Sequence, residues 1–470
     1  MNNIIQLVAQ KVKKEIERNL IKVLEGSTDL DHIVDSVGEM VNSIGLDTIS
    51  AIIGELNGII KDTPERKDKY HVHKNNAKRS LVTRFGDLKF ERTYFKNVKE
   101  DGFVFILDKI LGIEKYEKIE ANLKGSILEK SADVSYQKAA ELSTPVAITR
   151  ESVKRTIREN GTIDNLELEV KEKNKNKEVK TIYIEADEDH VPMQNGKNKI
   201  MKLIYVYDNK IEVNKGRTEL KNVRYFTGNM NPEDLWTEVA TYIDEAYDLE
   251  KVENIYIAGD GASWIKGGTQ IIKDSKFVLD HYHLSKYVKV LTAHLSSLEN
   301  PVNIDKPLWE SLRTGNKKLT LQLVNFAIEE TPSEKKKESM KKAKNYILNN
   351  WEGIINLFEE GKYRCSAEGH ISHILSSRLS SRPMGWSIIG ADEMARMRAY
   401  KANGGSIKEY YRKVRAERKK EERILEFDEK VVNNIKGTFS NVDPDKMIDM
   451  PFTYRTEGRW LKNMISCSGF

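Results

Sequence analysis

The stretch Thr-Ile-Tyr-Ile-Glu-Ala-Asp-Glu-Asp, residues 181–189, decides the fold class of this chain. Acidic and apolar side chains alternate along it, and the side chains of a β-strand point alternately to two faces. The pattern therefore predicts a strand with one apolar and one acidic face. Like charges on one face repel one another, and a bound divalent cation would offset that repulsion. The alternative is an acidic strand edge exposed to solvent. The acidic side chains of this face are Glu185, Asp187 and Asp189.

Further β-rich stretches follow this strand in a recognisable order. Two come directly after it, and a helix that begins at Pro232 and runs to about Tyr247 separates them from the last two. Three strands, a helix, a strand, a helix and a strand is the order of a ribonuclease-H-like fold, a mixed sheet flanked by helices. The four later strands are expected at 200–207, 223–227, 252–260 and 277–280.

Carboxylates fall at specific points of this scaffold. Asp260 ends the fourth strand, 73 residues beyond Asp187, and is followed by Gly261, which permits a tight turn beside a ligand. A site that holds two metal ions for phosphoryl transfer needs a third carboxylate. Glu368 lies 108 residues beyond Asp260, a spacing that is natural if an all-α insertion intervenes. Glu393 is the rival for this third position.

The sequence predicts a multidomain α+β or α/β protein in which the ribonuclease-H-like part follows several smaller modules. The linker at 171–180 is charged and has no apolar pattern, so we take it as a domain boundary. The expected parts are an N-terminal helical region at 1–65, a basic β-hairpin module at 66–110, a helix-turn-helix at 111–170, the first part of the catalytic core at 178–284, an all-α insertion at 285–362, core helices with a basic helix at 363–425, and a tail at 426–470.

Two of the early modules carry basic residues in patterns that suit DNA. Short helices at 135–142 and 150–158, joined by a turn, have the size of a helix-turn-helix whose second helix enters the major groove. An ordinary helical hairpin would look the same. The outward-facing cations of the second helix are expected to be Arg150, Lys154, Arg155 and Arg158. The exposed edge of the preceding β-hairpin is expected to carry Lys78, Arg79, Arg84, Lys89 and Arg92.

Composition narrows the class of protein. The chain has 470 residues, of which 32% are charged, and only two cysteines, which excludes a disulfide framework or a cysteine-based zinc site. No stretch approaches the eighteen or more uncharged apolar residues of a membrane span, and charges interrupt the N-terminus too often for a signal peptide. A cytoplasmic protein is expected. The net charge of +5 is mild, but residues 396–423 hold eleven Lys or Arg and four Asp or Glu, which fits either a phosphate-binding or a solvated helix.

Several longer segments, taken together, resemble a known family, the ISLre-type insertion-sequence transposases of bacteria. The likeness spans nearly the whole chain, and the set of motifs is more specific than any one of them. The segments are Glu-Ala-Asp-Glu-Asp-His-Val at 185–191, Ala-Gly-Asp-Gly-Ala-Ser-Trp-Ile at 258–265, Leu-Asp-His-Tyr-His-Leu at 279–284, Ala-Glu-Gly-His-Ile-Ser-His at 367–373 and Ser-Ser-Arg-Leu-Ser-Ser-Arg-Pro-Met-Gly-Trp at 376–386.

The resemblance implies a DDE transposase, an enzyme that cleaves and joins DNA with two Mg²⁺ ions, for which Mn²⁺ can substitute. Asp187 and Asp260 match its first two carboxylates, and Glu368 matches the third. Asp280 and His283 resemble an Asp-x-x-His motif, for which a positional role is expected rather than metal ligation. Trp264 is expected either to stack on a DNA base or to pack behind the strand.

The partners implied by the resemblance are double-stranded DNAs, namely the terminal inverted repeats of the element and a target, in the bacterial nucleoid. A homodimer or larger assembly is expected because two DNA ends are joined, and the apolar stripe of the first helix is the candidate dimer surface. Further cations expected to hold DNA are Arg378, Arg382, Arg412, Lys413 and Arg415. The alternatives are a structure-selective nuclease of the same fold and a DNA-binding regulator without catalysis.

Overall fold

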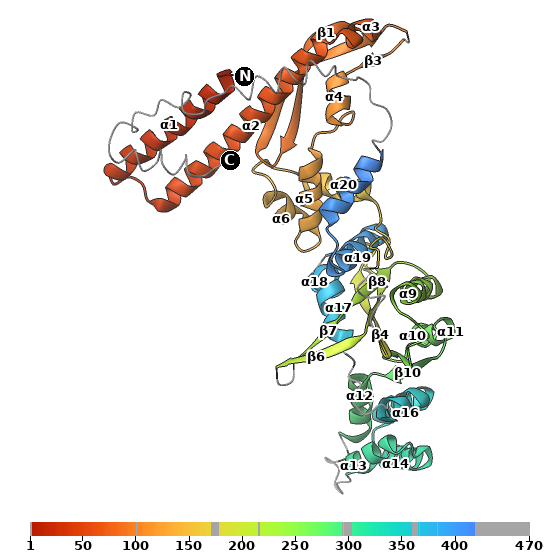
Figure 1. Ribbon diagram of the computed structural model, residues 1–470. Coiled ribbons are helices and arrows are strands. Elements are labelled where there is room, and N and C mark those ends of the chain that lie inside the picture. Colours follow the sequence, from red (N-terminus) through yellow and green to blue (C-terminus); the bar gives the residue numbers. More distant parts are fainter. Residues whose placement is uncertain are drawn as a thin grey trace. The chain divides into compact units, whose positions relative to one another are not determined.

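The computed structural model describes residues 2–99, 101–170, 178–214, 217–293, 295, 303–359, 365, 367–382 and 384–418 (Figure 1). The chain forms two compact units. The first comprises Met1–Ser131, Ser135–Thr156 and the residues from Lys408 onward, and the second comprises Ala132–Val134 and Ile157–Ile407. The tail expected at 426–470 lies outside the described residues.

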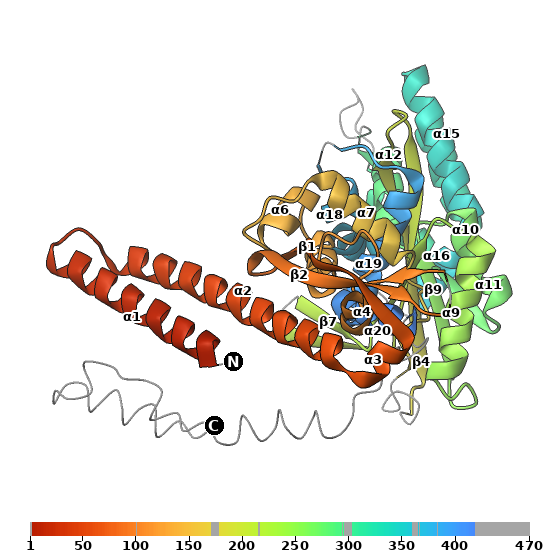
Figure 2. The ribbon, with the colours of Figure 1, turned by 90° about the horizontal axis from the view of Figure 1, so that it is seen from above.

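A helical hairpin opens the first unit. The helices α1 (Asn2–Leu24) and α2 (Leu30–Asp62) lie side by side and antiparallel (Figure 2). Gly26 takes a positive φ of 67° in the turn between them, and the Asp29 side chain caps α2 by accepting from the backbone N–H of His32. The two helices expected from the apolar stripe and the following helical pattern are therefore present.

The second half of α2 packs on a small antiparallel sheet of order β1-β2-β3. Because alternate residues of β1 and β2 face the helix, Leu81, Phe90 and Phe95 form a core with Ile53 and Ile60 of α2. The two long strands β1 and β2 and the turn between them form a hairpin within the expected module at 66–110. The elements of this part are α3 (Pro64–Lys69), β1 (Tyr70–Thr83), β2 (Gly86–Asn97), β3 (Phe103–Val104) and α4 (Ile106–Leu111).

Short helices complete the first unit. α6 and α7 are the expected pair of short helices, with Ser135 capping the first and the Thr149 hydroxyl accepting from the N–H of Ser152 at the start of the second. Val153 and Ile157 are buried, as expected for the inner face of α7. The helices are α5 (Ala121–Ser131), α6 (Tyr136–Glu141), α7 (Arg150–Asn160), which runs on into the second unit, and α20 (Ile407–Arg418).

The second unit contains a mixed five-stranded sheet of order β10-β9-β4-β5-β8. β4 is the central strand; β9 and β10 run parallel to it, β5 runs antiparallel to it, and β8 runs antiparallel to β5. All five strands lie where the sequence pattern placed them. The strands are β4 (Thr181–Pro192), β5 (Asn198–Tyr207), β8 (Arg224–Gly228), β9 (Asn254–Gly259) and β10 (Ser275–Leu279).

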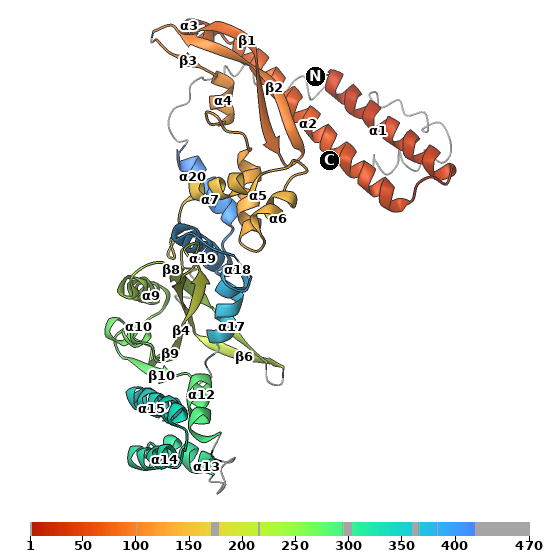
Figure 3. The same cartoon turned by 180° about the vertical axis from the view of Figure 1, so that it is seen from behind.

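One hairpin was missed by the sequence analysis. β6 (Asn209–Asn214) and β7 (Arg217–Lys221) form a separate two-stranded sheet that leaves the five-stranded sheet between β5 and β8 (Figures 1 and 3). Its strands are short and mostly polar, and the apolar alternation of the first covers only Ile211 and Val213, too short a run to indicate a half-buried strand.

Helices cover both faces of the sheet (Figure 3). The apolar face of β4, with Ile182, Ile184 and Ala186, packs on α9, where Leu235 and Trp236 are buried. The acidic face of β4 receives the segment that begins with α17, and α19 lies against β8. The helices of these layers are α9 (Pro232–Ala246), α10 (Ser263–Lys266), α11 (Gly268–Ile271), α12 (His281–Thr292), α17 (Ala367–Ile371), the π-helical turn η2 (Ser372–Ser376), α18 (Ser377–Leu379) and α19 (Ile388–Ala402).

The all-α segment expected after the fifth strand is also present. Its helices pack with α12 around one apolar core, which reaches the sheet through Ala258, Val278 and Leu279. The insertion therefore shares its core with the strands. Its helices are α13 (Asp305–Arg313), α14 (Lys317–Glu329), α15 (Glu334–Asn349) and α16 (Trp351–Glu359).

A glycine at the end of β9 tests this packing. A Cβ on Gly259 would lie 2.7 Å from the backbone oxygen of Ala186 on β4, so Gly259→Ala should force the two strands apart and destabilise the protein by about 1–3 kcal/mol. The measurement is the melting temperature by calorimetry. Gly369→Ala, on α17 in the same unit, is the matched control because nothing lies within 4 Å of its Cβ position. Equal melting temperatures for both variants would contradict the strand packing.

Candidate functional site

Three aspartates form one row across three adjacent parallel strands. Asp260 and Asp280 directly follow the ends of β9 and β10, and Asp187 lies within β4, two residues beyond its last pair with β9. Glu185 of β4 pairs with Ala258 of β9, and the next same-face residues along each strand are Asp187 and Asp260. Leu279 of β10 pairs with Gly259, which aligns Asp280 with Asp260. Since neighbouring strands are ~4.8 Å apart, the register alone brings the three side chains together.

The electrostatics of the row agree with this register. Burial raises the pKa of the Asp187 carboxyl to about 6; the backbone N–H of Glu188 opposes the rise, while the charges of Asp260 and Asp280 add to it. Asp187 is therefore a carboxylate held partly out of water beside two others of the same charge. Such an arrangement costs stability and is typical of functional sites.

Asp280 is held in place by its own helix. It is the N-cap of α12 and accepts from the N–H groups of Tyr282 at 3.1 Å and His283 at 3.4 Å. Its Oδ2 also lies 2.7 Å from Nδ1 of His283. This hydrogen bond raises the pKa of His283; burial opposes the rise, and Asp260 and Asp187 add to it. His283 is thus hydrogen-bonded to Asp280 beside the acidic row, and its expected positional role stays a prediction.

Residues of the helical insertion contact the turn at Asp260. The Tyr346 hydroxyl of α15 donates to the Asp260 carbonyl at 2.6 Å. Gly261 adopts a φ of +90°, and a Cβ there would lie 2.3 Å from Oδ1 of Asn350. Asp260 itself accepts from the N–H of Ala262 at 2.9 Å, which leaves its second oxygen for a ligand.

The other two acids of the β4 face have structural partners. Glu185 is fully buried and accepts from the hydroxyls of Tyr205 and Tyr207, the latter at 2.6 Å. Asp189 is buried and accepts from the Ser380 hydroxyl at 2.9 Å. The acidic face is therefore neither a solvated edge nor one uniform metal-binding surface: its two outer acids are bound by neighbouring side chains, and Asp187 lies between them.

Glu368 is exposed on α17, and within the described residues it makes no hydrogen bond or ion pair. The segment that carries it is nevertheless anchored on the acidic face. The Cys365 thiol donates to Glu185 at 3.3 Å, and burial raises its pKa well above the usual range. His370 stacks on Tyr205, with ring centres 4.4 Å apart, and its Nδ1 lies 2.7 Å from the Tyr225 hydroxyl. The structure thus brings the backbone near Glu368 to β4 without bringing its carboxylate to the aspartates.

Glu393, the rival third carboxylate, is buried on α19 and forms an ion pair with Arg158. α19 packs on β8, two strands away from β4 in the sheet order. Releasing this buried carboxylate for another partner would break the pair and leave the half-buried guanidinium of Arg158 without it, which costs stability.

The Trp264 side chain lies partly buried on the apolar side of the sheet. Its indole N–H donates to Glu188 at 3.0 Å, and its backbone oxygen accepts from the Trp236 indole at 2.8 Å. This is the packing alternative of the sequence analysis rather than a free face for a base.

The remaining cations named from the sequence fall into two groups. Arg150, Lys154, Arg155 and Arg382 are exposed, and Lys154 also lies 3.5 Å from Glu151 on the same helix. Others have partners inside the chain. Three form ion pairs: Arg158 with Glu393, Arg412 with Glu409, and the buried Arg415 with Glu117. Arg378 is buried, with its guanidinium 5.0 Å from the centre of the Trp386 ring. Lys413 is exposed on α20. Prediction from sequence could not separate these groups, because an outward position on an amphipathic helix does not show which partner lies opposite.

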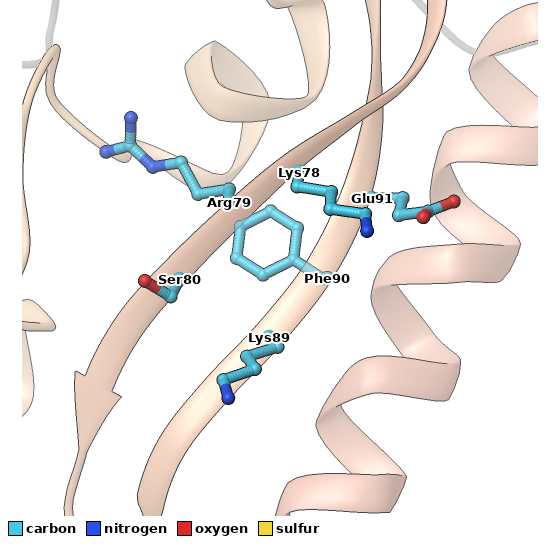
Figure 4. A pocket seen from close by; sticks show the side chains of 6 residues that line it. All are labelled: Lys78, Arg79, Ser80, Lys89, Phe90 and Glu91. Atoms are coloured by element: carbon cyan, nitrogen blue, oxygen red, sulfur yellow. The ribbon is translucent and has the colours of Figure 1, made fainter.

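A shallow cavity of about 520 Å³ lies on the β1–β2 sheet, lined by Lys78, Arg79, Ser80, Lys89, Phe90 and Glu91 (Figure 4). Lys78 and Lys89 are exposed there, as expected for this hairpin. Arg79 instead donates to the carbonyls of Glu114 and Glu117 at 2.9 Å. The expectation was wrong for Arg92, which is buried in an ion pair with Asp108, with its guanidinium 3.5 Å from the centre of the Phe105 ring.

The donor set of the aspartate row fits a hard divalent cation in part. Mg²⁺ prefers carboxylate oxygens and is commonly held by one or two carboxylates together with waters and substrate phosphates. Asp187 and Asp260 supply that number. In the part of the chain that the structure describes, no group of three His, Cys, Asp or Glu side chains is arranged to hold an ion by itself. Two carboxylates that need a substrate phosphate to complete the coordination are the arrangement that these residues allow.

The fold and the site thus define a mixed α/β protein with an aspartate row at the strand ends of its sheet. The chain belongs to UPF0236, an uncharacterised protein family whose model matches residues 24–420.

Similar proteins come from Caldanaerobacter subterraneus subsp. tengcongensis. One UPF0236 protein is 43% identical over 390 residues, covering 82% of this chain and 81% of its own, and its name joins eleven locus designations. Another, with four designations, is 42% identical and covers 82% and 81%. Among solved structures, the Drosophila P element transposase strand transfer complex has 11% identity and a TM-score of 0.23, covering 76% of this chain and 93% of the other. A TM-score this low does not establish a shared fold.

The raised pKa of Asp187 predicts a pH-dependent cost to stability. Its folded pKa of about 6 lies above the ordinary value of 3.8, so the fold favours the protonated carboxyl, and this contribution is lost as the pH rises through 6. At pH 7.5 the ionised form costs about 3 kcal/mol. Asp187→Asn should therefore melt at a higher temperature than the wild type at pH 7.5 in EDTA, and the difference should vanish near pH 4.

Scanning calorimetry between pH 4 and 7.5 measures this difference. Asp189→Asn is the control, since Asp189 is bound by Ser380 and no rise in its melting temperature is expected. A gain for Asp187→Asn that stays the same at every pH would show that packing, not charge, is its cause.

Proposed function

We propose that this protein is a DNA transposase of a bacterial insertion sequence that acts through a ribonuclease-H-like catalytic unit. The observation that carries the proposal is the row of Asp187, Asp260 and Asp280 on three adjacent parallel strands, with the pKa of Asp187 raised by burial and by its acidic neighbours. Carboxylates forced together in this way suit a site that recruits metal ions to phosphates.

The sheet supports the ribonuclease-H-like assignment. A mixed sheet with an antiparallel second strand, in the order β8-β5-β4-β9-β10, follows from three consecutive strands and two later parallel ones. The first acidic strand is central, and the second carboxylate is on the neighbouring parallel strand, at a strand end where α/β sheets place their functional residues.

The relatives add support of a different kind. One protein of C. subterraneus subsp. tengcongensis carries eleven locus designations in its name, and others carry four and two. A single protein named for many loci of one genome is what an element that copies or moves itself would produce.

In this proposal the residues of the chain divide the work. Asp187 and Asp260 would hold the metal ions, and Asp280 and His283 would position the row. Glu368 is exposed on a segment anchored at β4, so it would have to move toward the row when metal and DNA bind in order to act as the third ligand. Two Mg²⁺ ions, or Mn²⁺, would activate a water or 3′-hydroxyl and stabilise the leaving oxygen of a phosphodiester. The exposed face of α7 and the lysines of the β1–β2 hairpin would hold the element's inverted repeats, and a homodimer would bring two DNA ends together.

Catalysis is tested by strand transfer. The DNA flanking the coding sequence supplies the element ends, and joined products are measured with a supercoiled target and Mg²⁺. Asp187→Ala and Asp260→Ala should each lower joining by at least about 100-fold, as expected when groups that stabilise developing charge are removed. Asp189→Asn, on the same strand face but bound to Ser380, should keep joining within about tenfold.

The same assay separates the other readings. DNA that is cleaved but never joined would show that the protein is a nuclease and not a transposase. DNA binding without cleavage in Mg²⁺ or Mn²⁺ would show that the protein is a DNA-binding regulator without catalysis. For the third carboxylate, Glu368→Gln should abolish joining, whereas Glu393→Gln should lower the melting temperature, because Arg158 loses its partner, and keep joining. Loss of joining by Glu393→Gln at an unchanged melting temperature would reverse the two assignments.

DNA binding is tested separately on α7. Arg150 and Arg155 are exposed on this helix, so the double change to alanine should weaken binding to the flanking DNA and lower the slope of log affinity against log salt by about one for each phosphate that the helix no longer neutralises. Fluorescence anisotropy across a salt series gives both quantities. Lys335→Ala, an exposed lysine on α15, is the control. An unchanged slope in the double variant would remove α7 from the interface.

A further inference from the structure

The N-terminal hairpin buries almost nothing of its own apolar surface. In α1, over the side chains that the structure describes, the one buried residue is polar: Asn19, which is hydrogen-bonded to Glu15 and Ser36. In α2 the buried residues, Ile53 and Ile60, belong to the end that packs on the β1–β2 sheet. Helices of 23 and 33 residues are normally stabilised by packing of an apolar face, and no described residue outside the hairpin supplies that layer to its free part.

The missing layer has a definite place. A groove of about 250 Å³ runs along one side of the hairpin, between Ile16, Leu20 and Val23 of α1 and Ile33, Val37 and Met40 of α2. Leu20 is 48% exposed and Val37 is 39% exposed, although both line the groove. Over the part of the chain that the structure describes, the hollow is therefore apolar and lined by exposed side chains.

The apolar positions of α2 continue beyond the groove with a regular spacing. Leu30, Val34, Val37 and Val41 follow one another at steps of four, three and four residues, and all four are exposed. This is the spacing of a seam that packs against another helix. Within the hairpin, the contacts of Lys11 with Ser43 and Asp47, like that of Asn19 with Ser36, fix how the two helices are aligned.

Charge indicates what fills the groove. α1 carries five Lys or Arg and two Asp or Glu, whereas α2 carries six Asp or Glu and one Lys. A second hairpin of the same sequence can place its basic helix beside the acidic helix of the first, and its acidic helix beside the basic one. The hairpin is therefore complementary in charge to a copy of itself, related by a two-fold axis.

The size of the face agrees with a dimer. A helix of 23 residues is ~35 Å long, and two helices side by side are ~20 Å wide, which gives on the order of 700 Å². A standard protein interface takes ~800 Å² from each partner.

A membrane is the other occupant to consider. Among the described helices, α2 is long and apolar enough to cross a bilayer by length and composition. However, Ile53 and Ile60 near its end are built into the core of the first unit, and α1 beside it carries seven charged residues. These features favour a protein partner over lipid.

We propose that the α1–α2 hairpins of two copies of this chain pack groove to groove as a four-helix bundle. Each basic α1 then lies between two acidic α2 helices, and Leu20 and Val37 of both copies lie in the bundle core. Such up-and-down bundles pack their helices ~20° from antiparallel around side chains at these positions.

The test is the oligomeric state of the full-length protein, without DNA or metal, measured by sedimentation equilibrium over a concentration series. The wild type should be dimeric. Leu20→Glu should raise the dimer dissociation constant at least about tenfold, because it places two carboxylates in the apolar core. Ile21→Glu is the matched control: Ile21 is the next residue, is 55% exposed and does not line the groove, and its variant should dimerise like the wild type.

Circular dichroism and the melting temperature show whether each variant is folded. Val37→Glu is a second variant that should weaken the dimer, with the substitution on α2 instead of α1. A monomeric wild type, or dimers that Leu20→Glu, Val37→Glu and Ile21→Glu weaken equally, would overturn the proposal. The proposal would also be overturned if the wild type, but not Leu20→Glu, floated with anionic phospholipid vesicles, because the groove would then bind lipid. Because no catalytic step is measured, failure of this proposal and failure of the proposed transposase activity are distinguishable.

Discussion

The second unit depends on one constraint, the parallel register of β4, β9 and β10. That register places Asp187, Asp260 and Asp280 side by side, where their charges repel and where burial of Asp187 raises the pKa of its carboxyl to about 6. The surrounding contacts offset this repulsion. His283 is hydrogen-bonded to Asp280, the N-terminus of α12 binds the same carboxylate, and α15 holds the Asp260 carbonyl. A fold that maintains such a row sacrifices stability at one place, which is the usual relation between stability and function.

Much of this unit could be predicted from sequence because its signals are local. Alternation along 181–189 indicated a strand with two different faces, and all five strands and the following helical insertion lie where the pattern placed them. The alignment of Asp187 with Asp260 needed only the assumption of parallel neighbours. The charged β6–β7 hairpin was missed because its strands are short and carry few apolar residues.

The partners of charged side chains could not be predicted, because they come from distant parts of the chain. Glu185 and Asp187 look equivalent in the sequence, but tyrosines of β5 surround the first and leave the second to its acidic neighbours. Arg92 and Arg415 look like exposed cations, yet Asp108 and Glu117 bind them in buried pairs. Alternation fixes the face to which a side chain points, and only tertiary structure fixes what it meets there.

The hydrogen bond from Tyr346 to the Asp260 carbonyl has a consequence for how this family can diversify. This hydrogen bond ties the backbone that follows β9 to α15, whereas α13 and α14 precede α15 in the insertion. Lengthening or replacing those outer helices would leave the tether intact, whereas a deletion that reaches α15 would free the turn at Gly261. Natural variants should therefore tolerate changes of sequence and length in α13 and α14. Changes in α15 and α16 should instead be accompanied by changes in the sheet.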